Sequence, residues 1–253
     1  MPGANLVRVL TVLEGDVLAD RIGDGAPRVL ALHGWGRSGT DFAPVLAGYD
    51  GLAVHLPGFG STAEPPEVWG SAEYAAHLVP GIAGGGPYVV VAHSFGGRVA
   101  VRLAATHPEL VSALVLTGVP LVRATAAPKP ALSLRVAKHL RAAHLVPQSV
   151  VDRLRRNAGS ADYRAAQGVM RGVLVRVVGE DYREDLATIA ASGIPVHLVW
   201  GEDDDAAPLA GARLAAEALG VDVTVVPGAG HLLEGPVADA VRVRLVEVLG
   251  CTQ

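Results

Sequence analysis

This 253-residue chain has a single cysteine, no long apolar run and no excess of positive charge. The one cysteine, Cys251, has no partner within the chain, so no disulfide framework is expected. No spacing of cysteine and histidine typical of a zinc site occurs. No run of 18 apolar residues is present either, and the sequence therefore predicts neither a metal site nor a membrane-spanning helix.

The charge balance excludes further classes of partner. Lys and Arg number 21 against 25 Asp and Glu, a net charge of −4, which argues against a binder of nucleic acid or of anionic membranes. Neither of the glycine-rich motifs that cradle phosphates, G-x-x-x-x-G-K-[ST] and G-x-G-x-x-G, occurs. The first residues lack the basic region of a signal peptide, so the expected location is the cytoplasm.

Eight short runs rich in Val, Leu and Ala alternate with segments of helical pattern. The later runs are almost continuously apolar, which is typical of parallel strands covered by helices on both faces, whereas residues 5–20 indicate an antiparallel hairpin. The fold class is therefore α/β, with a mostly parallel eight-stranded sheet flanked by helices. Strands are expected at Leu6–Leu13, Val17–Asp20, Arg28–Leu32, Leu52–Leu56, Tyr88–Ala92, Leu110–Leu116, Val196–Trp200 and Val221–Val226. Helices are expected at Thr40–Leu46, Ala72–Ile82, Phe95–Thr106, Leu209–Leu219 and Val237–Leu249.

One segment breaks this alternation. Residues 120–185 contain no strand run, and helices are expected there at Leu132–Ala142, Gln148–Asn157 and Ala161–Val178. The segment holds 12 of the 21 Lys and Arg residues but only six of the 25 acidic ones. We interpret it as a basic helical insertion in a core formed by residues 1–119 and 186–253.

Ser94 lies in the pattern that most directly indicates chemistry. The apolar run Tyr88–Ala92 leads into His93-Ser94-Phe95-Gly96-Gly97 and then into a helical segment. A nucleophilic serine held in a strained strand-to-helix turn requires small neighbours two residues before and after it, here Ala92 and Gly96. The spacing alone is a weak signal, and a serine that only caps the helix is the alternative. The strand run before it favours a nucleophile.

A second loop, His33-Gly34-Trp35-Gly36, follows the expected strand at residues 28–32. In folds that present a serine in a strand-to-helix turn, two backbone N–H groups bind the oxyanion. One belongs to the residue after the serine, and the other to the loop that follows a neighbouring strand, as this loop does. The expected donors are the N–H groups of Trp35 and Phe95, with His33 and Gly34 beside the substrate. A glycine-rich turn without a catalytic role is the alternative, and the rings of His33 and His93 are more typical of structural histidines.

Carboxylates and a histidine follow the last two expected strands. Asp203, Asp204 and Asp205 come after the run at residues 196–200, and His231 follows Gly228-Ala229-Gly230. One carboxylate in such a place can orient an imidazole that activates a serine, although aspartates also favour turns and helix starts. The spacing by itself leaves open which of the three has that role.

The chain order of serine, aspartate and histidine is that of the α/β-hydrolase triad. Together with this order, five segments make the chain resemble the α/β-hydrolase fold serine hydrolases over nearly its whole length. They are residues 33–36, 56–60, 92–97, 201–208 and 230–231. The resemblance implies the α/β-hydrolase fold, catalytic Ser94, Asp204 and His231, no cofactor, and a helical cap at residues 120–185. Ala92 in place of Gly and His55 in place of Asp depart from the family pattern without removing a catalytic group.

A narrower resemblance concerns the possible partner. Trp35 after His33-Gly34 and the loop Leu56-Pro57-Gly58-Phe59-Gly60 are similar to the pimeloyl-carrier-protein methyl ester esterases, whose basic caps face an acidic acyl carrier protein. The resemblance implies such a partner at the basic cap, and an ordinary solvated surface is the alternative. The basic residues concerned are Arg135, Lys138, Arg141, Arg153, Arg155 and Arg156.

The resulting hypothesis is a serine hydrolase that cleaves carboxylic ester or thioester bonds of a small acyl substrate through an acyl-enzyme intermediate. Two alternatives stay open. One is a hydrolase of C–C bonds that uses a similar triad, and the other is a slow or non-catalytic module that binds a ligand or an acyl carrier. Ser94 counts against haloalkane dehalogenases and most epoxide hydrolases, which carry Asp at this position.

Overall fold

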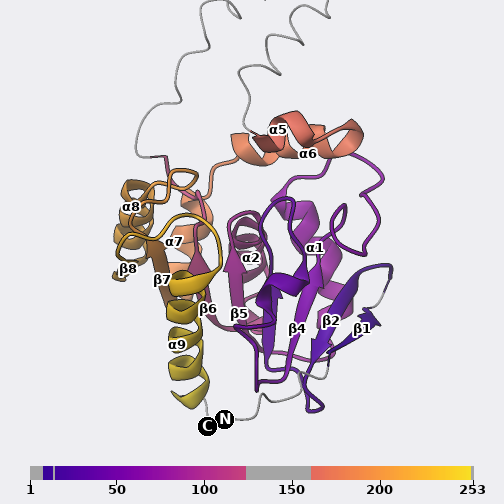
Figure 1. Cartoon of the computed structure of the whole chain (residues 1–253), viewed down its shortest axis with the longest axis horizontal. Coiled ribbons are helices and arrows are strands. Elements are labelled where there is room, and N and C mark those ends of the chain that lie inside the picture. Colours follow the sequence, from indigo (N-terminus) through magenta and orange to yellow (C-terminus); the bar gives the residue numbers. More distant parts are fainter. Residues whose placement is uncertain (1–7, 14, 124–160, 252–253) are drawn as a thin grey trace, which may run out of the picture.

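The computed structural model describes residues 8–13, 15–123 and 161–251. In these residues eight strands form one sheet in the order β1-β2-β4-β3-β5-β6-β7-β8 (Figure 1). The pairs β1·β2 and β2·β4 are antiparallel and the other pairs are parallel, as the hairpin and the continuously apolar runs predict. The strands are β1 (Arg8–Val12), β2 (Leu18–Ile22), β3 (Val29–Leu32), β4 (Gly51–His55), β5 (Tyr88–His93), β6 (Val111–Thr117), β7 (Val196–Gly201) and β8 (Val223–Val226).

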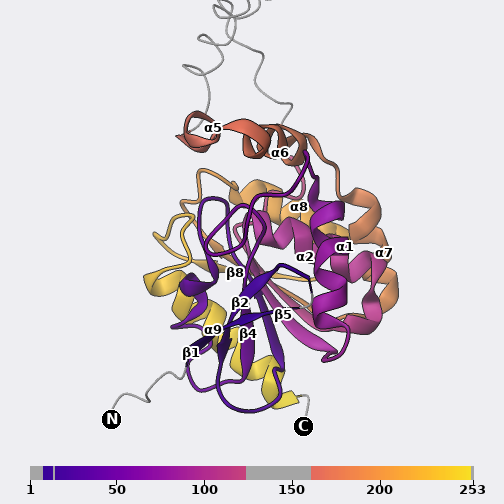
Figure 2. The same cartoon turned by 90° about the vertical axis from the view of Figure 1, so that its right-hand side faces the viewer.

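Helices cover both faces of the sheet, so its central strands β3, β4 and β5 are buried on both sides, whereas the edge strand β1 is exposed (Figure 2). One face packs on α1 (Ser71–Ile82), α2 (Phe95–Thr106), α7 (Arg183–Ser192) and α8 (Leu209–Leu219). The other face packs on α9 (Gly235–Cys251) and on the segment that contains the 3₁₀ turn η1 (Gly39–Phe42). A second 3₁₀ turn, η2 (Pro108–Leu110), precedes β6. The molecule is thus a three-layer sandwich of helices around one sheet.

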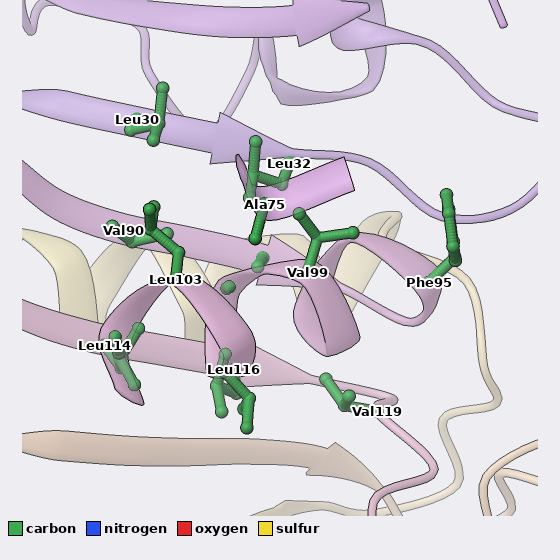
Figure 3. Close-up of a cluster of buried hydrophobic side chains, with 14 of the residues drawn as sticks. Leu30, Leu32, Ala75, Val90, Phe95, Val99, Leu103, Leu114, Leu116 and Val119 are labelled. Carbon is green, nitrogen blue, oxygen red and sulfur yellow. The ribbon is translucent and has the colours of Figure 1, made fainter. Parts of the chain in front are cut away.

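The period of two along each strand divides the core between these faces. In β3, Leu30 and Leu32 belong to the cluster beneath α1 and α2, while Val29 and Ala31 belong to the cluster beneath α9. Figure 3 shows the first cluster, in which strand side chains lie beside Val99 of α2. Burying one such Leu side chain is worth about 1.5–3 kcal/mol, so the sheet holds its carboxyl edge rigidly.

Three sequence predictions about helices are wrong in detail. Residues 40–46 form only the turn η1, because Pro44 has no N–H to continue a helical hydrogen-bond ladder. The expected helix at Ala161–Val178 is two helices, α5 (Ala161–Ala165) and α6 (Gly168–Gly179), since Gln167 is extended and Gly168 has a φ of 49°. Helix α7, at Arg183–Ser192, was not expected. The domain boundaries stay predictions, and the expected helices at 132–142 and 148–157 lie outside the described residues.

Helices α5 and α6 lie across the end of the sheet where the parallel strands terminate (Figures 1 and 2). The turn after α6 is tied to α1 by Glu180, whose carboxylate accepts hydrogen bonds from the N–H and Oγ–H of Ser71. The hydroxyl of Tyr182 donates to the same carboxylate at 2.6 Å. This anchor fixes α6 above the carboxyl ends of the strands.

The described residues contain neither a candidate membrane span nor a candidate metal cluster. No helix in them is both long and apolar enough to cross a bilayer. No group of three or more His, Cys, Asp or Glu side chains in residues 8–13, 15–123 and 161–251 is arranged to hold a metal ion. The cytoplasmic location stays a prediction.

Candidate active site

Ser94 occupies the sharp turn between β5 and α2. Its φ of 49° is the one positive φ among the described residues other than glycine. A non-glycine residue in this region is strained, and such strain is a feature of the turn that presents a nucleophile. The turn places the Ser94 hydroxyl at the carboxyl edge of the sheet and at the first turn of α2.

Gly96 allows this turn to approach the neighbouring strand closely. Its N–H donates to the carbonyl of His33 at 2.9 Å, and a Cβ at this position would overlap the carbonyl oxygen of Leu32. We therefore expect Gly96→Ala to lower the free energy of unfolding by about 3 kcal/mol, because backbone rather than a flexible side chain must move. Chemical denaturation measures the change. Gly84→Ala is the matched control, since a Cβ there meets no atom within 4 Å, and equal loss in both variants would contradict this packing argument.

Three polar side chains from distant segments form one hydrogen-bonded chain. The Nε2 atom of His231, on the loop after β8, lies 3.0 Å from Ser94 Oγ. Its Nδ1 lies 2.8 Å from Oδ2 of Asp204, which follows β7. Asp204 also accepts the N–H groups of Ala206 and Ala207, at 3.0 and 2.7 Å. With Nδ1–H donated to the carboxylate, Nε2 is free to accept the Ser94 proton.

Of the three aspartates after β7, the structure brings only Asp204 to His231. The Asp204 side chain is 1% exposed, while Asp203 and Asp205 are exposed residues. The backbone N–H groups of Ala206 and Ala207 fix the position of the Asp204 carboxylate. The geometry therefore agrees with the choice of Asp204 that the resemblance implies.

The two expected oxyanion donors lie on adjoining segments. Phe95 is the first residue of α2, where backbone N–H groups have no partner within the helix. Trp35 lies in the turn after β3, which Arg37 N–H closes by donating to Gly34 at 3.2 Å. The rings of Trp35 and Phe95 contact edge to face, with centroids 5.4 Å apart. A Cβ on Gly34 would lie 3.4 Å from the Cβ of Ser94, so the turn that contains Trp35 lies against the turn of Ser94.

Aromatic side chains extend this surface away from Ser94. Phe59 packs on Trp35 with ring centroids 4.9 Å apart, and Tyr74 packs on Phe95 at 5.0 Å. Met170 of α6 reaches the same group, its sulfur 3.9 Å from the Tyr74 hydroxyl. An apolar wall therefore stands beside the nucleophile turn, under α6.

The ring of His33 holds its own loop. It is fully buried, its Nδ1–H donates to the carbonyl of Gly34 at 2.7 Å, and its Nε2 accepts the N–H of Leu56 at 3.1 Å. Burial lowers the pKa of His33 from 6.5 to about 4, so this imidazole is neutral at pH 7. The ring therefore serves the structure of the loop, and substrate contact stays a prediction for the backbone of His33 and for Gly34.

Acid should destabilise the protein through His33. Its pKa is lower in the folded chain than in the unfolded one, so the unfolded chain binds more protons between pH 6.5 and about pH 4. The stabilisation is complete above pH 6.5 and is lost as the pH falls through this window, amounting to about 3 kcal/mol. Denaturation at several pH values measures it. His33→Asn should be less stable at pH 7 yet show a flatter dependence on pH, and an unchanged slope would count against this role.

His55, the second departure from the family pattern, has partners that the sequence did not reveal. Its Nε2 lies 3.2 Å from Oδ2 of Asp20, on the neighbouring strand β2, and its Nδ1 accepts the N–H of Ser61 at 3.1 Å. Arg8 pairs with the other Asp20 oxygen at 3.1 Å. His55 thus ties the loop at residues 56–61 to the sheet.

His93 is the functional candidate whose contact the sequence missed. Its Nε2–H donates to the backbone carbonyl of His231 at 2.8 Å, across 138 positions of sequence. The two rings lie 4.9 Å apart. No local pattern reports a contact at this separation, although the position of His93 next to Ser94 made it a neighbour of the site.

Known proteins share this fold. The model of the alpha/beta hydrolase family matches residues 29–243. The structure of a thermophilic esterase, 25% identical, superposes with a TM-score of 0.70 and covers 97% of this chain and 98% of that one. The α/β-hydrolase fold expected from the sequence is therefore confirmed.

Curated relatives are similar over part of their length or over nearly all of it. Esterase Rv0045c of Mycobacterium tuberculosis is 38% identical over 45% of this chain and 40% of its own. The Pimeloyl-[acyl-carrier protein] methyl ester esterase of Aeromonas hydrophila is 37% identical over 39% and 40%. The chain spans only about two fifths of the length of these two relatives. A 2-hydroxy-6-oxononadienedioate/2-hydroxy-6-oxononatrienedioate hydrolase of Cupriavidus pinatubonensis is 26% identical over 98% and 96%. With its family model matched over most of the sequence, the chain belongs to the alpha/beta hydrolase family.

Proposed function

We propose that this protein is a serine hydrolase that cleaves carboxylic ester or thioester bonds of a small acyl substrate, without a cofactor. The observation that carries the proposal is the hydrogen-bonded chain from Ser94 Oγ through His231 to Asp204. The named esterase relatives support the same reaction class. The apolar wall around Trp35 and Phe59 favours an apolar acyl group.

The reaction follows from the geometry of the three residues. Ser94 Oγ attacks the acyl carbon while His231 Nε2 takes its proton, and the resulting imidazolium returns a proton to the leaving group. Asp204 holds the imidazole with Nδ1–H toward the carboxylate and stabilises the imidazolium. Water, activated by His231 in turn, then cleaves the acyl enzyme.

The oxyanion of each tetrahedral intermediate is assigned to the N–H groups of Trp35 and Phe95. Two fixed donors aimed at a developing negative charge are a large source of catalysis, and the loss of one costs about 3 to 4 kcal/mol. The positive end of α2, on which Phe95 lies, favours negative charge at the same point.

Hydrolysis of p-nitrophenyl esters from acetate to decanoate tests this proposal. The wild type should turn these esters over, and turnover should be absent from the Ser94→Ala variant. The preferred chain length then reports how far the apolar wall extends. Equal rates in both proteins would refute the triad and favour the non-catalytic binding module instead.

C–C bond hydrolysis is the second candidate. It is favoured by one relative that is matched over nearly the whole chain and whose name describes substrates without an ester group. The substrates in the name of that Cupriavidus hydrolase carry hydroxyl, keto and carboxylate groups and no ester, so the bond broken there is of another kind. Turnover of a 2-hydroxy-6-oxo dienoate by the wild type, exceeding that of every ester, would favour this candidate. Ester turnover alone would exclude it.

An acyl carrier protein is proposed as the carrier of the acyl group. The relatives named as Pimeloyl-[acyl-carrier protein] methyl ester esterases support it. The basic residues at 135–156 that would face such a partner lie outside the described residues. Faster hydrolysis of a carrier-bound methyl ester than of the free ester, with the difference falling as salt rises, would support the partner. Equal rates would exclude it.

A further inference from the structure

We propose that His93 is a positioning residue that holds the loop of His231, so that the imidazole stays in line with Ser94. This inference rests on the proposed function, because it assigns His231 as the base. The carrying observation is the hydrogen bond from Nε2–H of His93 to the backbone carbonyl of His231, 2.8 Å long. His93 itself is the last residue of β5, next to Ser94.

His93 lies on a rigid element and contacts the segments of both Ser94 and His231. Its backbone is part of the central strand β5, which pairs with β3 on one side and β6 on the other. Its side chain is 3% exposed, whereas His231 lies half-buried on a loop that contains Gly228 and Gly230. The hydrogen bond therefore ties a glycine-containing loop to the strand that leads into the nucleophile turn. Misplacement of a catalytic group by about 1 Å can cost about 100-fold in rate.

His93 also occupies the space beneath the second loop of the site. Its Nδ1 is buried and has no hydrogen-bond partner among the described residues. A Cβ on Gly34 would lie 2.7 Å from that atom, so the ring fills the space that the glycine leaves open. A buried polar atom without a partner disfavours folding, and an apolar residue of similar size would avoid it. The bond that the other nitrogen, Nε2, makes to the carbonyl of His231 offsets this cost.

The charge state of His93 suits this role. Burial and the neighbouring His231 lower the pKa of His93 to about 4, so the ring is neutral at pH 7. The other titratable groups that act on it are Asp204 and Asp41, both acidic. A neutral ring donates the bond to the carbonyl of His231 without placing a second positive charge beside the imidazolium.

Three substitutions at position 93 separate this role from simple packing. The amide nitrogen of His93→Gln reaches about as far as Nε2 and can donate to the His231 carbonyl, while His93→Asn has the same amide one bond shorter and cannot reach. His93→Leu is apolar and has no donor. We expect Leu and Asn to lower kcat by about 10- to 100-fold with KM changed less than about twofold, and Gln to stay within about threefold of the wild type. Thermal unfolding of each variant shows that the comparison is made on folded protein.

The kcat values of the three variants at position 93 decide between a positioning role and simple packing. Low kcat in Leu and Asn with recovery in Gln supports the proposal, and wild-type kcat in Leu or Asn overturns it. Equal losses in all three variants overturn it as well, since they report packing alone. If the wild type hydrolyses no ester, the proposed function fails, and the downfield NMR signal of the His231 Nδ1 proton then decides the inference. Loss of that signal in Asn but not in Gln supports the positioning role, and its survival in both overturns it.

Discussion

Replacement of Ser94 by alanine should lower kcat for ester hydrolysis by about 10⁴-fold or more. The Oγ atom that would attack the acyl carbon is lost, and His231, 3.0 Å from it, is left without a proton to accept. The oxyanion donors remain, so a residual rate above the uncatalysed one is expected. Steady-state kinetics with a p-nitrophenyl ester measures the loss, and labelling by a fluorophosphonate should disappear with it.

Stability provides the control for this variant. Alanine keeps the Cβ of serine and therefore the strain at a φ of 49°, so the thermal midpoint of Ser94→Ala should stay near that of the wild type. Ser94→Gly removes both the nucleophile and the Cβ, and should be inactive yet more stable by about 1 kcal/mol. Activity retained by either variant would rule out Ser94 as the nucleophile.

Asp204→Asn should cost about 10⁴-fold in kcat, because an amide can donate to Nδ1 and so stabilises the wrong tautomer of His231. The Asp204 carboxylate now accepts from His231 Nδ1 and from the N–H of Ala206 and Ala207. The asparagine keeps the shape of the side chain, which limits the change to charge and to proton position. Steady-state kinetics with a p-nitrophenyl ester, compared with the wild type, measures the loss.

The neighbouring aspartates are the matched controls for this prediction. Asp203→Asn and Asp205→Asn alter the same charge in the same turn, but both residues are exposed and neither is bonded to His231 in the described structure. Each should stay within about tenfold of the wild type. A loss at Asp203 equal to that at Asp204 would show that the orienting carboxylate has been assigned incorrectly.

The sheet was predictable because its central strands are continuously apolar. The run Tyr88–Ala92 and its counterparts predict buried parallel strands, and the structure confirms them to within one or two residues at most ends. Helix α7 was missed because its sequence, REDLATIAAS, buries only three side chains and offers a weak amphipathic pattern. The break between α5 and α6 was missed because a glycine inside a helical pattern does not by itself reveal a positive φ.

The candidate site was predictable to the extent that local turns identify it. Ser94 between Ala92 and Gly96 is a local signal, since the turn cannot form with larger neighbours. Asp204 was selected only through the resemblance to a family, because its neighbours Asp203 and Asp205 have the same chemistry. The role of His93 depends on a contact with a residue 138 positions later, which no local pattern contains.

The long connection between the paired strands β6 and β7 allows the surface above the sheet to change in evolution. These strands pair in register from Leu114 with Val196, although 78 residues, 118–195, separate their ends. The entropy of closing a loop grows slowly with its length, by about 0.6 kcal/mol for each doubling. Changes of length in this segment outside α6 and α7, which pack on the core, therefore cost the pairing of β6 with β7 little. Selection can reshape the surface over the nucleophile while the proposed chemistry stays constant.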